Sequence, residues 1–296
     1  MRSIEWWRTR RTWLILNPAD SSRPDLLTAI VAATKRAVQD RTVAVPFREL
    51  EKSWGERVPD GRRFVEGLRR LDRYNVIAEC KRRSPSRGVL SDVYDPSDIA
   101  SGYAHAGAAA VSVLTEPAFF DGRLEHLEAV REAVELPLLR KDFIVTDYQL
   151  LEACLAGADA VLLIAAILDT SELRRLLRQA KDYGLAVLTE VHNAEELSRS
   201  LEAGAEVIGV NNRDLRSFDV DLEASEVLME QIPADVTAVA ESGLTSAGEL
   251  IGLRRAGYHA FLIGGAFMCQ PVPGEALSDL LRDVHLKMKV PDDGGG

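Results

Sequence analysis

From residue 76 onward, short apolar runs alternate with stretches long enough to form one amphipathic helix each. Successive runs begin 21 to 34 residues apart, which leaves room for a helix and two loops in every interval. This alternation is typical of parallel βαβ units, and eight such units can close into a barrel. The eight predicted strands are residues 76–80, 110–114, 138–140, 160–164, 186–189, 207–210, 237–240 and 260–263.

An Ala-Gly pair comes just before every second run, with the glycines at Gly107, Gly157, Gly204 and Gly257. A glycine at such a position is best explained as the left-handed residue that ends a helix before the next strand. Recurrence at alternate units favours a barrel, whose interior layers are filled by alternate strands. The alternative is a doubly wound open sheet, which usually has a glycine-rich turn after its first strand, and residues 79–82 contain no glycine. We therefore predict an α/β protein with a (β/α)8 TIM barrel.

The residues before the first strand show helical periodicity at 26–38 and again at 62–71. We expect these helices to cover the barrel and to belong to one barrel domain spanning residues 24–288. Residues 1–23 form a Trp- and Arg-rich N-terminal extension to which no role is assigned, and residues 289–296 are expected to be a disordered tail.

The charge balance excludes some functions. The chain has 36 Lys and Arg against 46 Asp and Glu, a net charge of −10, and 46% of its residues are hydrophobic. A disordered chain is excluded, and so is a nucleic-acid-binding protein with a broad basic face. A small anionic substrate remains compatible with this composition.

The three cysteines are far apart and form no CxxC pair, which indicates a reducing, cytoplasmic environment rather than a disulfide framework or a thiolate zinc site. The adjacent residues Arg10 and Arg11 suggest a secretion signal, but the apolar run that follows, at 13–16, ends at Asn17. A signal core needs about 7–15 apolar residues and a membrane span about 20, so neither is predicted.

Polar side chains mark the carboxyl ends of the predicted strands, where barrel enzymes place their catalytic groups. Because these ends meet at one mouth, we expect six side chains to converge there: Glu79, Lys81, Lys141, Glu190, Asn211 and Glu241. Asp142 is expected only to orient its neighbours. For Glu79 with Lys81, or Lys141 with Glu190, the alternative is an ion pair that only closes the top of the barrel. Burying the whole set without a function would be costly, which favours a catalytic site.

Small residues in three loops after strands indicate a phosphate site. Ser84, the pair Ser242-Gly243 and the pair Gly264-Gly265 offer free backbone N–H groups, and the last two pairs follow strands seven and eight. The histidines show no metal-ligand spacing, although His192 lies close to the mouth, two residues past Glu190. Nothing in the sequence calls for a metal, a flavin or a nicotinamide.

The string VIAECKRRSPSRG at 76–88 resembles the first-strand signature of the indole-3-glycerol phosphate synthase family. Six further motifs follow in that family's order and spacing, from about residue 24 to about residue 277. They are SVLTE at 112–116 with Phe119 and Phe120, LRKDFIV at 139–145, GADAVLLIA at 157–165, EVH at 190–192, GVNNRDL at 209–215 and AESG at 240–243.

The resemblance implies a TIM barrel of the ribulose-phosphate-binding type and a carboxy-lyase of tryptophan biosynthesis that uses no cofactor. The implied reaction closes the ring of 1-(2-carboxyphenylamino)-1-deoxyribulose 5-phosphate to give indole-3-glycerol phosphate, carbon dioxide and water.

The resemblance also implies roles for individual residues. Lys141 is the general acid at the substrate carbonyl, Lys81 contacts the substrate carboxylate or acts as the acid in dehydration, and Glu79 and Glu190 accept protons or hold the lysines. Further implied contacts are Asn211, Arg213, Glu241 and Ser242 for polar groups, Phe120 and Phe143 for the aromatic ring, and Ser84, Gly243, Gly264 and Gly265 for the phosphate.

Two alternatives stay open at this point. One is another phosphate-binding barrel enzyme of the tryptophan pathway, such as a phosphoribosylanthranilate isomerase or a tryptophan synthase α-like lyase. The other is a catalytically silent barrel scaffold. We expect a monofunctional monomer with a phosphorylated small-molecule substrate, no nucleic-acid or membrane partner, and at most weak association with other pathway enzymes.

Overall fold

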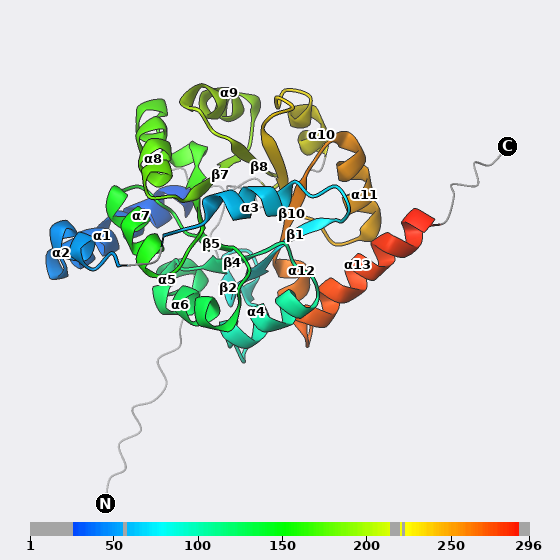
Figure 1. Cartoon of the computed structure of the whole chain (residues 1–296), viewed down its shortest axis with the longest axis horizontal. Helices are drawn as coiled ribbons and strands as arrows, with labels where there is room; N and C mark the ends of the chain where they lie inside the picture. The colour runs from blue at the N-terminus through cyan, green and yellow to red at the C-terminus, as the bar shows by residue number, and fades with distance from the viewer. Residues whose placement is uncertain (1–25, 56–57, 214–219, 221–222, 290–296) are drawn as a thin grey trace, which may run out of the picture.

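A computed structural model describes residues 26–55, 58–213, 220 and 223–289. Within these ranges the helices surround a central group of strands (Figure 1). The predicted extension at 1–23 and the tail from residue 290 onward lie outside the described residues.

The eight predicted strands form a closed parallel barrel in the order β1-β10-β9-β8-β7-β6-β5-β4, so the predicted fold is confirmed. Several strands continue one or two residues further than predicted, and Lys141, Glu190, Asn211 and Glu241 therefore belong to strands rather than to loops. The strand bounds are β1 Asn75–Cys80, β4 Ala110–Leu114, β5 Leu138–Lys141, β6 Ala160–Ile164, β7 Ala186–Val191, β8 Val207–Asn211, β9 Thr237–Glu241 and β10 Ala260–Ile263.

The register of the barrel brings the polar strand ends to one level. Asn211 on β8 is paired with Glu241 on β9, and Glu190 on β7 is paired with Gly209 on β8. Side chains two residues apart on a strand share a face, so these positions project together from the same end of the barrel.

The helices that return the chain between strands lie outside the barrel. The glycines at 107, 157, 204 and 257 all have positive φ, between 89° and 117°, as predicted for residues that end helices. The main helices are α4 Pro96–His105, α6 Leu124–Ala133, α7 Asp147–Leu155, α8 Thr170–Asp182, α9 Ala194–Ala203, α10 Glu223–Met229, α11 Ala247–Ala256 and α13 Pro273–Lys289.

Short elements complete the connections. A two-stranded antiparallel hairpin after β1, which the sequence analysis did not predict, is formed by β2 Arg83–Ser84 and β3 Gly88–Val89. The remaining short helices are α5 Pro117–Phe120, the 3-10 helix η1 Ala165–Ile167 and α12 Gly265–Met268.

The core has two layers. A small cluster fills the barrel interior and includes Ile77, Leu139, Leu188 and Val239. A larger cluster packs the outer faces of the strands against the surrounding helices. Burial of apolar area on both faces of each strand supplies the main stabilisation of the scaffold that holds the mouth.

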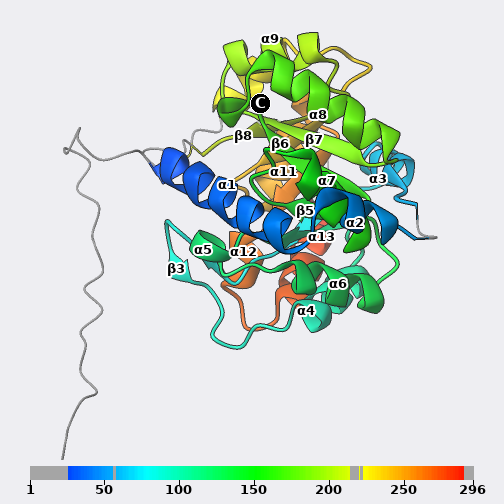
Figure 2. The same cartoon turned by 90° about the vertical axis from the view of Figure 1, so that its left-hand side faces the viewer.

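The N-terminal helices cover the barrel, as expected. Helix α3, Gly61–Leu68, buries Phe64 and Leu68 in the interior cluster. Helix α1, Leu26–Ala44, is longer than predicted and buries Ile30 in the same cluster. The short α2, Phe47–Lys52, follows it. Figure 2 shows α1 lying across the side of the molecule that faces the viewer.

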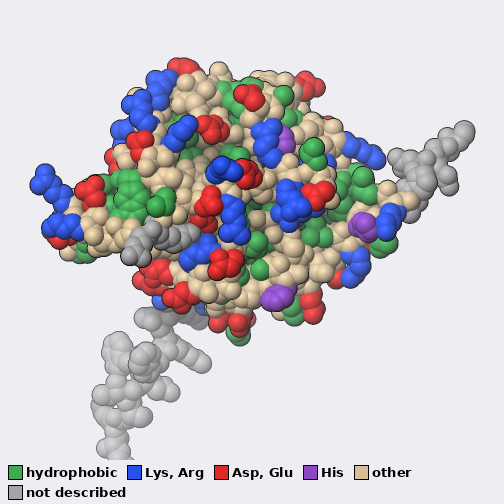
Figure 3. Space-filling view, in the orientation of Figure 1, with side chains coloured by type: hydrophobic (Ala, Val, Ile, Leu, Met, Phe, Trp, Pro, Cys, Tyr) green, Lys and Arg blue, Asp and Glu red, His purple; other side chains and the backbone are tan. Residues whose placement is uncertain are grey.

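The surface carries charges of both signs. On the face shown in Figure 3, basic and acidic side chains are interspersed, without a broad basic region. In the part of the chain that the structure describes, no helix combines the length and apolar character needed to cross a membrane.

Candidate active site

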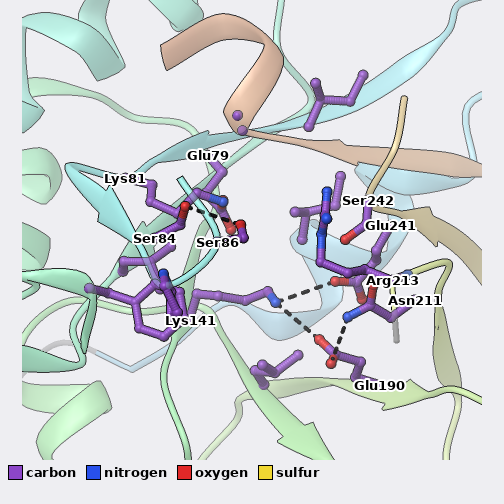
Figure 4. A pocket seen from close by; sticks show the side chains of 18 of the residues that line it. Glu79, Lys81, Ser84, Ser86, Lys141, Glu190, Asn211, Arg213, Glu241 and Ser242 are labelled. Atoms are coloured by element: carbon purple, nitrogen blue, oxygen red, sulfur yellow. Dashed lines mark hydrogen bonds and ion pairs between the residues drawn. The ribbon is translucent and has the colours of Figure 1, made fainter. Parts of the chain in front are cut away.

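One pocket at the carboxyl ends of the strands contains every predicted site residue (Figure 4). The six residues of the predicted mouth come from five different strands or the positions just after them, which only barrel closure brings together. The predicted residues that line this pocket are Glu79, Lys81, Ser84, Phe120, Lys141, Phe143, Glu190, Asn211, Arg213, Glu241, Ser242, Gly243, Gly264 and Gly265.

Lys141 occupies the centre of the charged part of the pocket. Its Nζ lies 3.0 Å from Oε2 of Glu190 and 3.4 Å from Oε2 of Glu241. The other oxygen of Glu190 accepts a hydrogen bond of 3.0 Å from Nδ2 of Asn211. Figure 4 shows these contacts as dashed lines, with β5, β7, β8 and β9 each supplying one member.

The charges around Lys141 fix its protonation state. Burial lowers the pKa of the Lys141 ammonium, but Glu190, Glu241 and Glu79 outweigh this, and the pKa is raised well above its usual value. The side chain is therefore protonated at neutral pH, although only 14% of it is exposed. The mouth therefore contains a buried ammonium group.

The two carboxyl groups that contact Lys141 differ in the direction of their pKa shifts. Burial raises the pKa of Glu190, but Lys141 and His192 outweigh it, and the pKa ends well below the usual carboxyl value. For Glu241, burial and the negative charge of Glu190 raise the pKa despite the attraction of Lys141. Glu190 is therefore the firm anion of the pair, whereas Glu241 holds a proton more readily.

Glu79 and Lys81 form a second ion pair, between Oε1 of Glu79 and Nζ of Lys81. Glu79 is buried, and its carboxyl group fills the space beside Gly264, where a Cβ atom would lie 2.9 Å from Cδ of Glu79. The predicted mouth thus contains two Lys-Glu groups that face one pocket, the two combinations that the sequence analysis considered as ion pairs.

Backbone conformation shapes the predicted phosphate end. Ser242 has a φ of 65°, which is unusual for a residue with a side chain, and Gly243 follows with 78°. Both residues follow β9 directly and line the pocket. Gly264 and Gly265 begin α12 at the adjacent strand end. Ser84 is committed in part to its own loop, because its Oγ accepts a hydrogen bond of 3.2 Å from the backbone N–H of Arg87.

Two arginines line the same pocket. Burial and the positive charge of Arg87 both lower the pKa of Arg213. An anion bound near these cations would relieve their mutual repulsion. Arg87 was missed as a site residue by the sequence analysis, although it lies in the loop singled out for phosphate.

An apolar wall faces the charged groups. The rings of Phe120 and Phe143 lie 6.1 Å apart between centroids, at an angle of 37°. Helix α1 adds Leu26, Leu27 and Ile30, which the sequence analysis placed only on a covering helix. Further apolar lining from strand ends was also missed: Leu114, Leu162, Ile164 and Leu262. The alternation of apolar side chains along the strands was the sequence signal that could have predicted this lining.

Asp142 orients its neighbours, as expected. Its Oδ2 lies 2.8 Å from Nη2 of Arg140 and accepts a hydrogen bond of 2.7 Å from Oγ1 of Thr115. Its Oδ1 accepts a hydrogen bond from the backbone N–H of Phe143. Asp142 therefore holds the segment on either side of Lys141 through contacts within the protein.

The closed barrel, with proton donors and acceptors gathered at its carboxyl end, defines a (β/α)8-barrel enzyme. Within the described residues, no three His, Cys, Asp or Glu side chains are grouped so that they could hold a metal ion.

Comparison with known proteins identifies the family. The family model for indole-3-glycerol phosphate synthase matches residues 27–280. The synthase of Campylobacter jejuni strain 81116 is 43% identical over 257 residues, covering 86% of this chain and 100% of the relative. The synthase of Carboxydothermus hydrogenoformans is 44% identical over 266 residues, covering 86% and 99%. The chain belongs to the indole-3-glycerol phosphate synthase family.

Solved structures support the fold. Tryptophan synthase subunit alpha from Legionella pneumophila aligns with a TM-score of 0.58 at 13% identity, over 78% of this chain and 100% of that one. Thiamine phosphate pyrophosphorylase from Pyrococcus furiosus aligns with a TM-score of 0.55 at 17% identity, over 72% and 96%. At these identities the similarity concerns the barrel alone.

Proposed function

We propose that this pocket closes the ring of 1-(2-carboxyphenylamino)-1-deoxyribulose 5-phosphate to give indole-3-glycerol phosphate, carbon dioxide and water. Membership of the family makes the chain a carboxy-lyase of tryptophan biosynthesis that acts on a small phosphorylated substrate. The observation that carries the assignment to this pocket is the buried, protonated Lys141 between two glutamates at the barrel mouth.

In the first step, the ring carbon that bears the carboxylate attacks the ketone carbon of the sugar chain. A carbon–carbon bond forms, the carbonyl π electrons move to oxygen, and Lys141 donates its proton to that oxygen. Positioned acids of this kind commonly accelerate a reaction by about 10² to 10⁴-fold. Glu190 remains an anion beside the lysine and holds its ammonium group in place.

The second step removes carbon dioxide. The electrons of its carbon–carbon bond return to the ring and restore aromaticity, so no external oxidant or reductant is needed. Dehydration follows, with Lys81 as the acid that protonates the leaving hydroxyl. A carboxylate, Glu79 or Glu190, accepts the proton from the neighbouring carbon. The Glu79–Lys81 ion pair supplies an acid and a base at one place.

The remaining residues bind the substrate in this proposal. Phe120 and Phe143 take the aromatic ring, since both rings line the pocket beside one another. Asn211, Arg213, Glu241 and Ser242 contact polar groups of the chain. The phosphate lies at Ser84, Gly243, Gly264 and Gly265, where backbone N–H groups and the nearby Arg87 favour an anion.

A direct assay tests the proposal. Purified protein is mixed with the carboxyphenylamino-deoxyribulose phosphate in buffer containing EDTA, and indole fluorescence is followed. We expect fluorescence to rise, with one carbon dioxide released per indole formed. A folded protein that produces no indole from this substrate would refute the assignment and favour the silent scaffold.

We also propose that the chain works as a monomer in the cytoplasm. Among the described residues, Cys80, Cys154 and Cys269 form no disulfide bond, which supports a reducing compartment. Association with other enzymes of the pathway would be weak. Sedimentation of the purified protein at several concentrations tests the monomer.

A further inference from the structure

We propose that His192 is a positioning residue, whose imidazolium links the Glu190 carboxylate to Glu196 and holds Glu190 in place beneath Lys141. The inference rests on the proposed function only for its kinetic consequences. His192 does not line the pocket, so it acts through Glu190 rather than by touching the substrate.

The ring of His192 lies between two carboxylates. Its Nε2 is 3.4 Å from Oε1 of Glu190, and its Nδ1 is 3.1 Å from Oε2 of Glu196. The backbone N–H of His192 donates a hydrogen bond of 2.8 Å to that same Oε2. Asn193 donates from Nδ2 to the other oxygen of Glu196, at 2.8 Å. Glu196, in the first turn of α9, is therefore fixed from several sides and fixes the ring in turn.

Glu190 accepts hydrogen bonds from two groups, and the His192 ring lies beside it at 3.4 Å without a hydrogen bond. Lys141 binds Oε2, whereas Asn211 and His192 both face Oε1. Only 3% of the Glu190 side chain and 14% of the His192 side chain are exposed. A carboxylate confined in this way keeps one orientation, which is what a group that must hold or accept a proton at a set point requires.

The charge balance explains why a second cation is needed. The titratable and charged groups that face His192, which follows β7, are Glu190 on β7, Glu196 on α9, Glu241 on β9 and, beyond Glu190, Lys141 on β5. Within this buried group, Lys141 contacts two of the three carboxyl groups, Glu190 and Glu241. Burial lowers the pKa of His192, but the hydrogen bond with Glu196 and the charge of Glu190 outweigh it and raise the pKa above 6.5. The positive charge of the imidazolium offsets negative charge that would otherwise raise the pKa of Glu190.

The test combines kinetics with a readout that is independent of turnover. In the His192→Asn variant, we expect kcat to fall about 10-fold with KM nearly unchanged, because the ring does not touch substrate. Removal of a positive charge near Glu190 should raise the pKa of its carboxyl group. The pH at which kcat falls on the acid side should therefore rise by about one unit. Glu196→Gln should shift this pH in the same direction by less. The control is His105→Asn on α4, an exposed histidine whose Nδ1 lies 2.7 Å from the carbonyl oxygen of Ser101 on the same helix.

The second readout is the titration of the His192 ring by ¹⁵N NMR in wild type and in Glu190→Gln, with the signal assigned by its loss in His192→Asn. We expect the pKa of His192 to fall in Glu190→Gln. A pKa that does not respond to this change, or a His192→Asn enzyme with an unchanged pH profile and only a lower Tm, would overturn the inference. A wild type without activity would instead refute the proposed function, while the NMR result would still decide the link between His192 and Glu190.

Discussion

The carboxyl group of Glu241 lies in the space that a side chain at Gly209 would occupy. A Cβ atom at position 209 would overlap Oε1 of Glu241 and lie 3.1 Å from both Cδ of Glu241 and Cδ1 of Leu188. Because Glu241 is buried and faces Lys141 with its other oxygen, the glycine sets how far this carboxylate can withdraw from the lysine. The lack of a Cβ atom at Gly209 on β8 thus leaves room for the Glu241 carboxyl group in the charge cluster formed by β5, β7 and β9.

Replacing this glycine should therefore impair catalysis. We expect Gly209→Ala to displace the Glu241 carboxylate and to lower kcat by about 10-fold or more, because small misplacements of catalytic groups are costly. The matched control is Gly252→Ala on α11, where a Cβ atom would meet no other atom within 4 Å. Steady-state kinetics of both variants provide the check, and equal activity in the two would contradict this role of Gly209.

The two glutamates that share Lys141 should affect stability in opposite ways as pH changes. The pKa of Glu190 is lowered, so its contribution is present above the unfolded-state value near 4.5 and is lost as pH falls toward its folded value. The pKa of Glu241 is raised, so its contribution is present below about 4.5 and is lost as pH rises through its folded value.

Substitution by glutamine separates these effects. Relative to wild type, Glu190→Gln should be most destabilised at neutral pH and less so at acid pH. Glu241→Gln should gain stability relative to wild type as pH rises from acid to neutral. Urea unfolding at several pH values measures both trends. Parallel slopes for the two variants would show that their pKa values are not shifted in opposite directions.

Arg87 should contribute to the binding of the phosphate. Loss of one charge-assisted hydrogen bond to an anion costs about 1.5–3 kcal/mol, so we expect Arg87→Ala to raise KM about 10-fold or more. Inhibition by inorganic phosphate should weaken in parallel. Arg62→Ala is the control, since Arg62 is exposed on α3 and pairs with Glu66 away from the pocket. A change in kcat alone would contradict a role in binding.

Glu152 should be important for stability. Its carboxylate is 6% exposed and binds both Arg41 of α1, at 2.6 Å, and Arg140, at 3.3 Å. Glu152→Ala removes one of the two carboxylates that pair with the buried Arg140 and leaves Asp142, and breaking a buried pair costs about 3–5 kcal/mol. Urea unfolding should show this loss. Glu202→Ala, which removes the exposed pair with Arg174, should have little effect, and an equal loss in both variants would argue against the buried network.

The sequence predicted which residues meet at the mouth, because strand periodicity and barrel closure determine it. Four of the strands carry a charged residue at or near the carboxyl end: Glu79, Lys141, Glu190 and Glu241. A closed parallel barrel brings these strand ends together. Strand ends were misplaced by one or two residues, since the strands continue through these charged side chains, whose polarity resembles that of a loop.

The sequence analysis considered Glu79 with Lys81 and Lys141 with Glu190 as ion pairs, but it did not predict the second contact of Lys141, with Glu241. The Glu241 carboxyl group occupies the space beside Gly209, which depends on the closed barrel. The position of α1 over the pocket likewise depends on a contact distant in sequence, between Arg41 and Glu152. Local periodicity predicted the helix but contained no information about this docking.

The central claim is that Lys141 donates the proton that permits ring closure in this pocket. The most direct measurement is the release of carbon dioxide and indole product from the carboxyphenylamino-deoxyribulose phosphate by wild type and Lys141→Ala. We predict equal amounts of both products from wild type and a loss of about 10³-fold or more in kcat for the variant, with its fold preserved by circular dichroism. A folded Lys141→Ala enzyme that forms indole at the wild-type rate would contradict the account.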